Sequence, residues 1–406
     1  MEQGANEQHP AMMKIALLSI STVLTSSIAI AASIPDWLKA FPQQSRANVE
    51  LLGTLPSLTV IICMLLSSWV AKKIGTRRTI LMGLLIAGTF GIIPVFFSNY
   101  YVLFFARLGL GAGFGLINSL AVSLIGTFFT GQEKANLMGY RGSCEMLGNA
   151  LCTYVAGQLL VHVGWHSSFW VYALSFPLAI LYFLYVPEPA PSKEADGTPH
   201  KESINSKVFF WTLILIICQM AYTGSTLRIS ELVTSYHIGS LNGIAIVLSF
   251  APACGVISEI FFGRLLHGMG TFLLPVTIFC TGLSQLLIAF SNNFVLTSIG
   301  FLATSMISGL VISYILNLAS DICETNSLNL TTSLMLVGCN IGPFLSPIVL
   351  GWLNSAFGAN NLRLSYDVFG VILLGMGIVM VFLSKSMSAS YAKNENENGG
   401  LTHVDE

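Results

Sequence analysis

Arg107 and Glu145 each lie inside a long apolar stretch of the sequence, where an ionised side chain is costly. Arg107 is about seven residues into the apolar segment 101–125, and Glu145 is about eight residues into the segment 138–161. A buried guanidinium can bind an anionic ligand or take part in a proton relay, and a desolvated carboxylate can bind and release a proton. The structural alternatives are a buried pair that holds the amino-terminal helices together for Arg107, and a permanent salt bridge to Arg141 for Glu145. We take both side chains as candidates for substrate binding or proton coupling.

Small residues accompany both charges at helical spacing. Gly111 and Gly115 follow Arg107 at i+4 and i+8, and Gly148 follows Glu145 at i+3. Residues at these spacings share one helical face, and glycines on that face allow another helix or a ligand to come close. The residues that we expect at close helix contacts are Gly111, Gly115, Gly148, Gly157, Gly342 and Pro343.

Polar and aromatic side chains in other apolar segments could line a central cavity. Tyrosine, asparagine and glutamine offer hydrogen bonds while aromatic rings supply apolar surface, which suits an amphiphilic organic ligand. The candidates are Asn118, Gln219, Tyr222, Tyr314, Asn317 and Asn340. Nothing in the sequence resembles a phosphate-binding loop or a catalytic triad, so we expect a protein that is not an enzyme and needs no cofactor or metal.

The composition places these residues in a membrane protein. Only 9% of the 406 residues are charged, 54% are hydrophobic and the mean hydropathy is +0.74, whereas a soluble domain carries about 25% charged residues. The net charge of −1 and the scattered basic residues give no nucleic-acid-binding surface, and the eight cysteines form no metal-binding cluster.

Continuous apolar runs, each near the roughly 20 residues that a transmembrane helix needs, predict an all-α polytopic membrane protein. The first run is longer than the apolar part of a signal peptide, so we expect it to be retained. The twelve expected spans are 15–34, 49–70, 79–98, 101–125, 138–161, 168–186, 207–226, 241–262, 271–290, 294–318, 327–353 and 364–385.

Basic residues lie mostly on one side of these spans. With the amino terminus inside, twelve of the 18 lysines and arginines fall in cytoplasmic segments and four in outer loops, among them Arg228, and such a bias sets membrane orientation. We expect both termini in the cytoplasm of a bacterial cell. Asp36 and Glu50, near the outer ends of the first two spans, are interpreted as solvated helix ends, with outer gate residues as the alternative.

A loop rich in proline and charge separates the first six spans from the last six, as a flexible linker does. The expected parts are a cytoplasmic amino terminus 1–14, a six-helix bundle 15–186, a cytoplasmic linker 187–206, a second six-helix bundle 207–385 and a disordered cytoplasmic tail 386–406.

The two halves resemble each other in sequence. "YVLFFARLGLGAGFGLINSL" from Tyr101 aligns with "FVLTSIGFLATSMISGLVIS" from Phe294, and "SWVAKKIGT" at 68–76 aligns with "GRLLHGMGT" at 263–271. A third pair, "GNALCTYVAG" and "GCNIGPFLSP", follows in the same order, and the three offsets are 193, 195 and 190 residues. Parallel six-helix repeats are typical of transporters with a substrate site near the membrane midplane between the halves.

Three segments, taken with twelve spans split six and six, resemble signatures of the major facilitator superfamily over residues 12–385. "SWVAKKIGTRR" at 68–78 is similar to the loop signature G-x-L-A-D-R-x-G-R-R, although Lys72 stands where the family usually has aspartate. "RLGLG" from Arg107 is similar to R-x-x-Q-G in helix 4, with leucine in place of glutamine. "GNALCTYVAG" keeps the outer glycines of G-x-x-x-G-P-x-x-G-G, which marks many proton-driven antiporters, but lacks the internal Gly-Pro pair.

The resemblance implies the fold and the activity. It implies a monomeric secondary active transporter in which two six-helix pseudo-repeats rock around a central site by alternating access. We expect export of a small organic molecule in exchange for protons, with the lipid bilayer, the substrate and the proton as partners. The alternatives are an uptake symporter or facilitator of a small metabolite, and a transporter-like membrane protein that senses a ligand.

The basic residue at position 72 predicts an altered cytoplasmic gate. The family's aspartate docks near the start of helix 11, where a helix amino terminus favours negative charge. We therefore expect Lys72 or Lys73 to pair with Asp321 or Glu324, with ordinary solvated loop charges as the alternative. The residues assigned to this gate are Lys72, Lys73, Gly75, Arg77, Arg78, Asp321 and Glu324.

Overall fold

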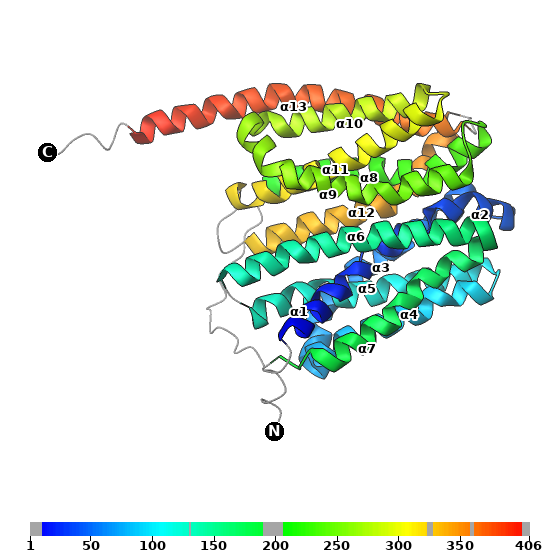
Figure 1. The fold of residues 1–406 in the computed structure, drawn as a ribbon. Helices are drawn as coiled ribbons and strands as arrows, with labels where there is room; N and C mark the ends of the chain where they lie inside the picture. Colours follow the sequence, from blue (N-terminus) through cyan, green and yellow to red (C-terminus); the bar gives the residue numbers. More distant parts are fainter. Residues whose placement is uncertain (1–9, 130, 190–205, 323–327, 358–360, 400–406) are drawn as a thin grey trace.

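The computed structural model describes residues 10–129, 131–189, 206–322, 328–357 and 361–399, and these residues form helices and no strand. Eleven helical stretches are long and apolar enough to span a membrane. One of them, the 50-residue stretch Leu241–Phe290, contains two helices that run back and forth, since a single helix of that length would measure about 75 Å. The described residues therefore supply twelve crossings, and the predicted all-helical polytopic architecture is confirmed (Figure 1).

The helices of each half follow one another as a bundle of roughly antiparallel rods (Figure 1). The first half consists of α1 (Pro10–Ser19), η2 (Ile20–Val23), η3 (Ser26–Ile28), η4 (Ala31–Ser33), α2 (Ile34–Ala40), α3 (Arg46–Ile74), α4 (Thr76–Phe96), α5 (Tyr100–Phe128), α6 (Gly131–Val163), η5 (Trp165–Leu174) and α7 (Ser175–Tyr185). The second half consists of α8 (Ser206–Ser235), α9 (Leu241–Met269), η6 (Gly270–Phe272), α10 (Leu273–Phe290), α11 (Phe294–Ile322), α12 (Leu328–Ala356) and α13 (Leu362–Gly399). The last helix thus includes residues 386–399 of the segment for which the sequence favours disorder.

The bundle has two ends, which we name by what they carry. The termini side carries the start of α1, the α3–α4 hairpin at Gly75 and the end of α13 (Figure 1). The far side carries the connections from α2 to α3, from α8 to α9 and from α10 to α11. The halves meet where α3 packs against α12 and where α6 packs against α9.

The internal repeat extends to helix lengths and caps. Helices α3 and α9 both have 29 residues and start 195 residues apart, and α5 and α11 both have 29 residues and start 194 apart. The Asn99 side chain accepts hydrogen bonds from the second and third backbone N–H groups after it, at 2.8 and 3.4 Å. Asn293 makes the same two bonds at the same distances. Both asparagines therefore cap equivalent helices.

The first span is not one continuous α-helix, contrary to the expectation for 15–34. Its middle, from Ile20 to Ser33, consists of short 3-10 turns. Hydroxyls in this serine- and threonine-rich segment bond back to the chain, with Thr22 Oγ1 donating to the Ser19 carbonyl (2.7 Å) and Ser26 Oγ to the Val23 carbonyl (2.6 Å). Such local bonds compete with the regular helical ladder.

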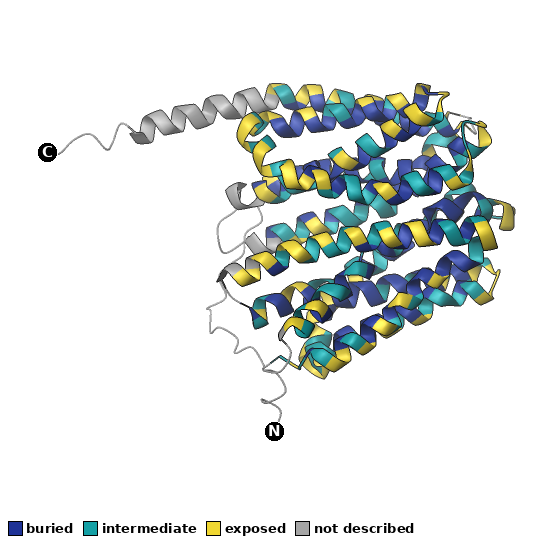
Figure 2. Ribbon diagram, viewed as in Figure 1, coloured by how far each residue is buried: buried dark blue, intermediate teal, exposed yellow. Residues whose placement is uncertain are grey.

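Apolar side chains lie both inside the bundle and on its outer surface. The inward faces of the helices are buried while outward faces are exposed (Figure 2). Leu65, Phe105 and Ile180 are each more than 60% exposed. An apolar exterior of this kind fits a lipid environment, because a helix that crosses a bilayer meets hydrocarbon on its outer face.

Candidate functional site

A small pocket lies between the halves, beside the unwound part of the first span. It leaves about 20 Å³ of free space, enough for about one water molecule, so a larger ligand requires the halves to part. It is lined by Ile28 and Ala31 of the first span, Asn149 and Thr153 of α6, Tyr222 and Thr226 of α8, Leu248, Ala251 and Pro252 of α9, and Phe301 of α11. The pocket thus combines apolar walls with four polar side chains, which is typical of a small-molecule site.

Hydrogen bonds around the pocket determine which groups remain for a ligand. Thr153 Oγ1 donates to Asn149 Oδ1 (3.4 Å), so the Asn149 amide N–H groups are left to donate. Ser305 donates to the Ala251 carbonyl (2.7 Å), and the Tyr222 hydroxyl at 3.4 Å from Ser305 Oγ is then the donor of that pair.

Thr226 uses its hydroxyl proton in the same way, because its Oγ1 donates to the Tyr222 carbonyl (3.0 Å). With their protons engaged, the Thr226, Thr153 and Tyr222 hydroxyls present oxygen lone pairs. The pocket therefore offers one amide donor group and three hydroxyl acceptors.

An ion pair lies one helical turn from Asn149 on the termini side. Glu145 Oε2 is 3.4 Å from Arg141 Nη2, and the same nitrogen donates to Asn118 Oδ1 at 3.2 Å. The Arg141 and Glu145 side chains are 15% and 20% exposed. Glu259, on α9 of the other half, interacts electrostatically with Glu145. The structure thus brings Asn118 and Glu145 together and adds a second carboxylate that sequence analysis did not single out.

Arg107 lies in a cage of oxygen atoms within the first half. Its Nε donates to the Leu52 carbonyl at 2.8 Å, and its Nη2 donates to the Gly53 carbonyl at 2.9 Å and to the Ser27 carbonyl. Its Nη1 donates to the Tyr172 hydroxyl at 3.1 Å, and the side chain is fully buried. These contacts favour the structural interpretation of Arg107.

Two of the three carbonyls of this cage, those of Leu52 and Ser27, are open to Arg107 because of features visible in the sequence. Pro56 has no N–H, so the Leu52 carbonyl four residues earlier has no partner within α3. Ser27 lies in the unwound part of the first span, where the regular i to i−4 ladder is interrupted. Arg107 therefore satisfies oxygens that a proline and a broken helix leave open.

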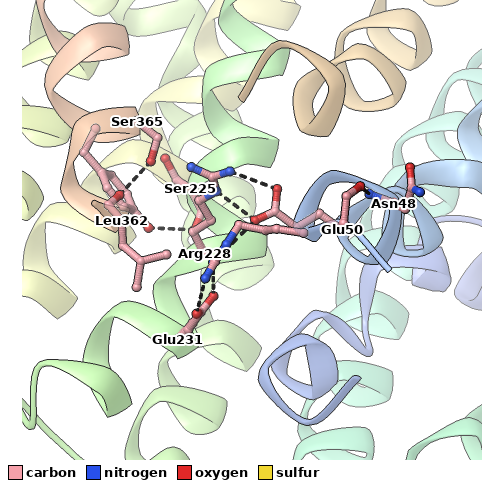
Figure 3. Close-up of polar contacts among 10 residues, drawn as sticks. Asn48, Glu50, Ser225, Arg228, Glu231, Leu362 and Ser365 are labelled. Atoms are coloured by element: carbon pink, nitrogen blue, oxygen red, sulfur yellow. Dashed lines mark hydrogen bonds and ion pairs between the residues drawn. The ribbon is translucent and has the colours of Figure 1, made fainter. Parts of the chain in front are cut away.

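A network of four charges joins the halves on the far side of the pocket. Arg228 of α8 donates from Nε and Nη2 to the two Glu50 oxygens of α3, at 2.9 and 3.1 Å. Arg46, one turn before Glu50, contacts Glu231 through two bonds of 2.5 and 2.8 Å. Figure 3 shows Glu50, Arg228 and Glu231 meeting between α3 and α8. We call Arg46, Glu50, Arg228 and Glu231 the far-side network.

The far-side network corrects two sequence-based expectations. Glu50 is not a solvated helix end, because its side chain is 0% exposed and paired. Arg228 does not lie in a loop, because α8 continues to Ser235 and buries its side chain. Asp36 is 32% exposed and pairs with Lys39 at 3.2 Å, which fits the solvated interpretation.

The α3–α4 hairpin docks on the end of α7, within its own half. The Glu188 carboxylate accepts from the backbone N–H of Arg77 at 3.2 Å through both oxygens, at the amino terminus of α4. The Arg77 guanidinium donates to the Phe183 carbonyl and lies over the Phe183 ring. Gly75 has φ +93° and sits against Glu188, so this turn favours glycine.

The proposed cytoplasmic gate falls partly outside the described residues. Lys73 lies over the Trp69 ring at 3.8 Å, and Lys72 and Arg78 are exposed. Glu324 is outside the described residues, and only the helical backbone of Asp321 is described. The pairing of Lys72 or Lys73 with these acids stays a prediction.

The remaining candidate residues are spread over the second half. Gln219 is buried on α8, against Gly342 of α12. Asn340 donates to the Leu336 carbonyl of its own helix at 3.1 Å. Tyr314 is half-buried and Asn317 is exposed on α11. Of the predicted cavity residues, only Tyr222 lines the pocket.

The six positions expected at close helix contacts differ in what surrounds them. A Cβ on Gly115 would lie 2.6 Å from the Val60 carbonyl, and one on Gly157 would lie 2.9 Å from Ala245 Cβ across the halves. Pro343 lies inside α12. The positions at which an added Cβ would meet a neighbouring helix or turn within 3 Å are Gly111, Gly115, Gly148, Gly157 and Gly342.

Comparison with known proteins points to one family. The family model described as Major Facilitator Superfamily matches residues 15–321, roughly three quarters of the chain. A solved structure of a bacterial homolog of the human lysosomal transporter Spinster has a TM-score of 0.74 at 16% identity, covering 93% of this chain and 97% of that one. The nucleoside transporter NupG also has a TM-score of 0.74, at 13% identity, covering 92% and 99%.

Three of the relatives with similar sequences are named as transporters of small molecules or ions. A cis,cis-muconate transport protein of Acinetobacter baylyi is 24% identical over 44% of this chain, and the match spans less than half (43%) of that protein. A probable nitrate transporter of Staphylococcus epidermidis is 26% identical over 70% of this chain and 72% of its own length. A 2-nitroimidazole transporter of Escherichia coli is 28% identical over 58% of this chain and 62% of its own length.

Proposed function

The chain belongs to the Major Facilitator Superfamily, and on that premise we propose that it exports a small organic molecule in exchange for protons by alternating access. As a member of this family it is an integral membrane transporter of a small substrate and not an enzyme. The proposed substrate, direction and proton coupling rest on the pocket and on the charged residues beside it.

The pocket between the halves is the observation that carries the proposal. Residues of both halves line it, so a rocking motion of one half against the other would expose it first to one side and then to the other. It lies beside broken helical backbone of the first span. Unwound helices line the binding sites of other transporters because their backbone groups are free for contacts.

The hydrogen-bonding groups of the pocket favour a small, flat, neutral molecule that carries both a donor and an acceptor. The Asn149 amide would donate to an acceptor such as a nitro oxygen, and the hydroxyl oxygens of Tyr222 and Thr226 would accept from a ring N–H. The compound named for the Escherichia coli relative, 2-nitroimidazole, has both groups on one planar ring. Nitrate and the muconate dianion, named for the other two relatives, offer acceptors only.

Glu145 is the proposed proton-coupling residue. It lies one turn from the pocket and it pairs with Arg141, and Glu259 on the other half is near enough to repel it electrostatically. Movement of the halves would change the distance between these two like charges, and with it the affinity of Glu145 for a proton. Uptake of protons from the outside would then drive export.

The membrane orientation follows from the basic residues. We propose that the termini side faces the cytoplasm of a bacterial cell and that the far side faces outward. In this orientation the hairpin that carries Lys72, Lys73, Arg77 and Arg78 lies in the cytoplasm.

Substrate-dependent proton movement in proteoliposomes tests the proposal. Purified protein is reconstituted with a pH-sensitive dye inside the vesicles, and 2-nitroimidazole, nitrate and cis,cis-muconate are added in turn. We expect 2-nitroimidazole to move protons in the direction opposite to its own movement. Its transport without any change of pH would contradict proton coupling, and binding without transport would favour the sensor alternative.

Two variants assign the roles. Tyr222→Phe removes an acceptor and should raise the KM for 2-nitroimidazole about fivefold to tenfold, the value of one hydrogen bond. The control Tyr236→Phe, at the far-side surface, should leave the KM unchanged.

Glu145→Gln should retain substrate binding and lose proton movement. The control Glu133→Gln, on the same helix, removes an exposed pair with Lys14 and should leave proton coupling unchanged. Normal coupling in Glu145→Gln would remove this residue from the mechanism.

A further inference from the structure

We propose that the far-side network is a releasable latch, in which the Glu50–Arg228 pair holds the far side closed and separates when the far side opens. This inference rests on the proposed alternating access. It adds Glu50 and Arg228 to the residues that act in the transport cycle, although neither lines the pocket.

The geometry of the latch places it between the parts that must move. Glu50 and Arg228 come from different halves, and so do Arg46 and Glu231, so each ion pair breaks if α3 and α8 part. Two neighbouring contacts close the same side. Gln158 Nε2 of α6 donates to Asn242 Oδ1 of α9 at 3.1 Å, and a Cβ on Gly351 of α12 would lie 2.9 Å from Ala47 Cβ of α3.

The burial of the pair makes each partner depend on the other. Glu50 is 0% and Arg228 is 1% exposed, whereas the outer pair is more accessible, with Arg46 27% and Glu231 13% exposed. Removing one member of a buried pair leaves the other charged and desolvated, which is strongly unfavourable. In the far-side-open state water would reach both groups, so the same removal would cost little there. A single neutralising variant should therefore shift the equilibrium toward the open state.

The charged pair also differs from an apolar contact in being releasable. Apolar residues of similar volume commonly replace a buried ion pair with equal or greater stability, since no charge has to be desolvated. In addition, within the described part of the chain Arg228 Nη1 has no hydrogen-bond partner, so the closed pair is incompletely satisfied. An apolar pair at positions 50 and 228 should therefore hold the far side closed more firmly and slow transport.

Crosslinking across the far side measures the latch directly. Gln158→Cys and Asn242→Cys are introduced together in the full-length chain, and crosslinking by a short thiol-specific bifunctional reagent in membranes reports how often the far side is closed, since the two side chains meet there. The seven cysteines described in the structure lie within helices of the spans, and the chain without the new pair gives the background. No substrate is needed, so failure of the latch is distinguishable from failure of the proposed function.

The latch predicts opposite results for single and double variants. Glu50→Gln should lower the ratio of closed to open protein by about a hundredfold, seen as slower crosslinking. Glu50→Leu with Arg228→Leu should crosslink at least as fast as the unmodified pair and transport more slowly. Arg363→Gln is the matched control, because Arg363 is a far-side arginine that bonds Asn292 within its own half (2.6 Å), and it should leave crosslinking unchanged.

A charge-swapped chain keeps the test decisive if the single variant folds poorly. Glu50→Arg with Arg228→Glu restores the opposite charges and should recover crosslinking relative to either change alone, with the thermal unfolding of each purified protein as a check on folding. Equal crosslinking in Glu50→Gln, the double leucine variant and the parent would overturn the latch. So would a swapped chain whose defect is the sum of the two single defects, because the two positions would then act independently.

Discussion

Arg107 is a buried charge that donates its hydrogen bonds to other groups of the protein. Its guanidinium donors reach oxygens of Leu52, Gly53, Ser27 and Tyr172, which belong to three different spans of the first half. A guanidinium suits this task because its fixed fork of N–H groups can reach several acceptors at once. A charge inside an apolar segment therefore indicates a polar partner, and here the partners are three backbone carbonyls and a tyrosine hydroxyl.

Replacement of Arg107 by glutamine should destabilise the protein by about 3 kcal/mol or more, because several buried oxygens lose their donor. The apparent melting temperature of the purified protein measures this loss, and Arg264→Gln, at an exposed arginine, is the control. The KM of the protein that remains folded should not change. A raised KM with an unchanged melting temperature would instead place Arg107 in contact with the substrate.

At the scale of helices, glycines fix how closely neighbours approach. Gly115 of α5 lies against α3, where an added Cβ would be 2.6 Å from the Val60 carbonyl and 2.8 Å from Cys63 Cβ. Gly142 of α6 has nothing within 4 Å of an added Cβ. The two glycines look alike in sequence but differ in whether another helix covers them.

Gly115→Ala and Gly142→Ala should therefore change stability in opposite directions. The alanine at 115 has to push α3 away, at a cost of about 1–3 kcal/mol, whereas the alanine at 142 should gain up to about 1 kcal/mol from its better helix propensity. Thermal unfolding of both purified variants tests this. A similar gain in both would mean that α3 and α5 are not in close contact at Gly115.

The spans could be predicted from the sequence because hydropathy and turn residues are local signals. The expected segments 241–262 and 294–318 correspond to α9 and α11, which begin at the expected residues. The expected segment 207–226 stops too early, because Arg228 and Glu231 lower the hydropathy of the last two turns of α8. Those charges are tolerated only because partners on α3 neutralise them.

The candidate site was predictable only in part, because its residues meet through packing. Tyr222 was a candidate for a central cavity and lines the pocket, and the pairing of Glu145 with Arg141 was the structural alternative to a coupling role. The pairing of Glu50 with Arg228 joins positions 178 residues apart, and no periodicity or motif marks it. The broken first span had a usable signal, since its serines and threonines are of the kind that bond back to the local backbone.

At the scale of the whole molecule, charge is distributed unevenly between the two sides. Four basic residues were expected in outer loops, and two of them, Arg46 and Arg228, are neutralised by Glu231 and Glu50 in the far-side network. The side expected to face outward therefore carries even less free positive charge than the sequence suggests. This strengthens the expectation that the termini side is cytoplasmic.

Single cysteines at exposed positions should reveal this orientation. Gln43→Cys, in the loop between α2 and α3, should react with a membrane-impermeant maleimide on intact cells, whereas Arg78→Cys at the termini side should react only after permeabilisation. The unmodified chain gives the background. The opposite labelling pattern would invert the proposed topology and, with it, the direction of export.

The cage around Arg107 also sets an order for assembly during synthesis. The first span precedes α5 in the chain, yet its Ser27 carbonyl accepts a hydrogen bond from Arg107, 80 residues later. Its unwound turns expose backbone oxygens that hydrocarbon cannot hydrate. The unwound segment therefore depends on later parts of the chain, α5 and η5, to satisfy its backbone oxygens, so a span made earlier is completed by spans made after it.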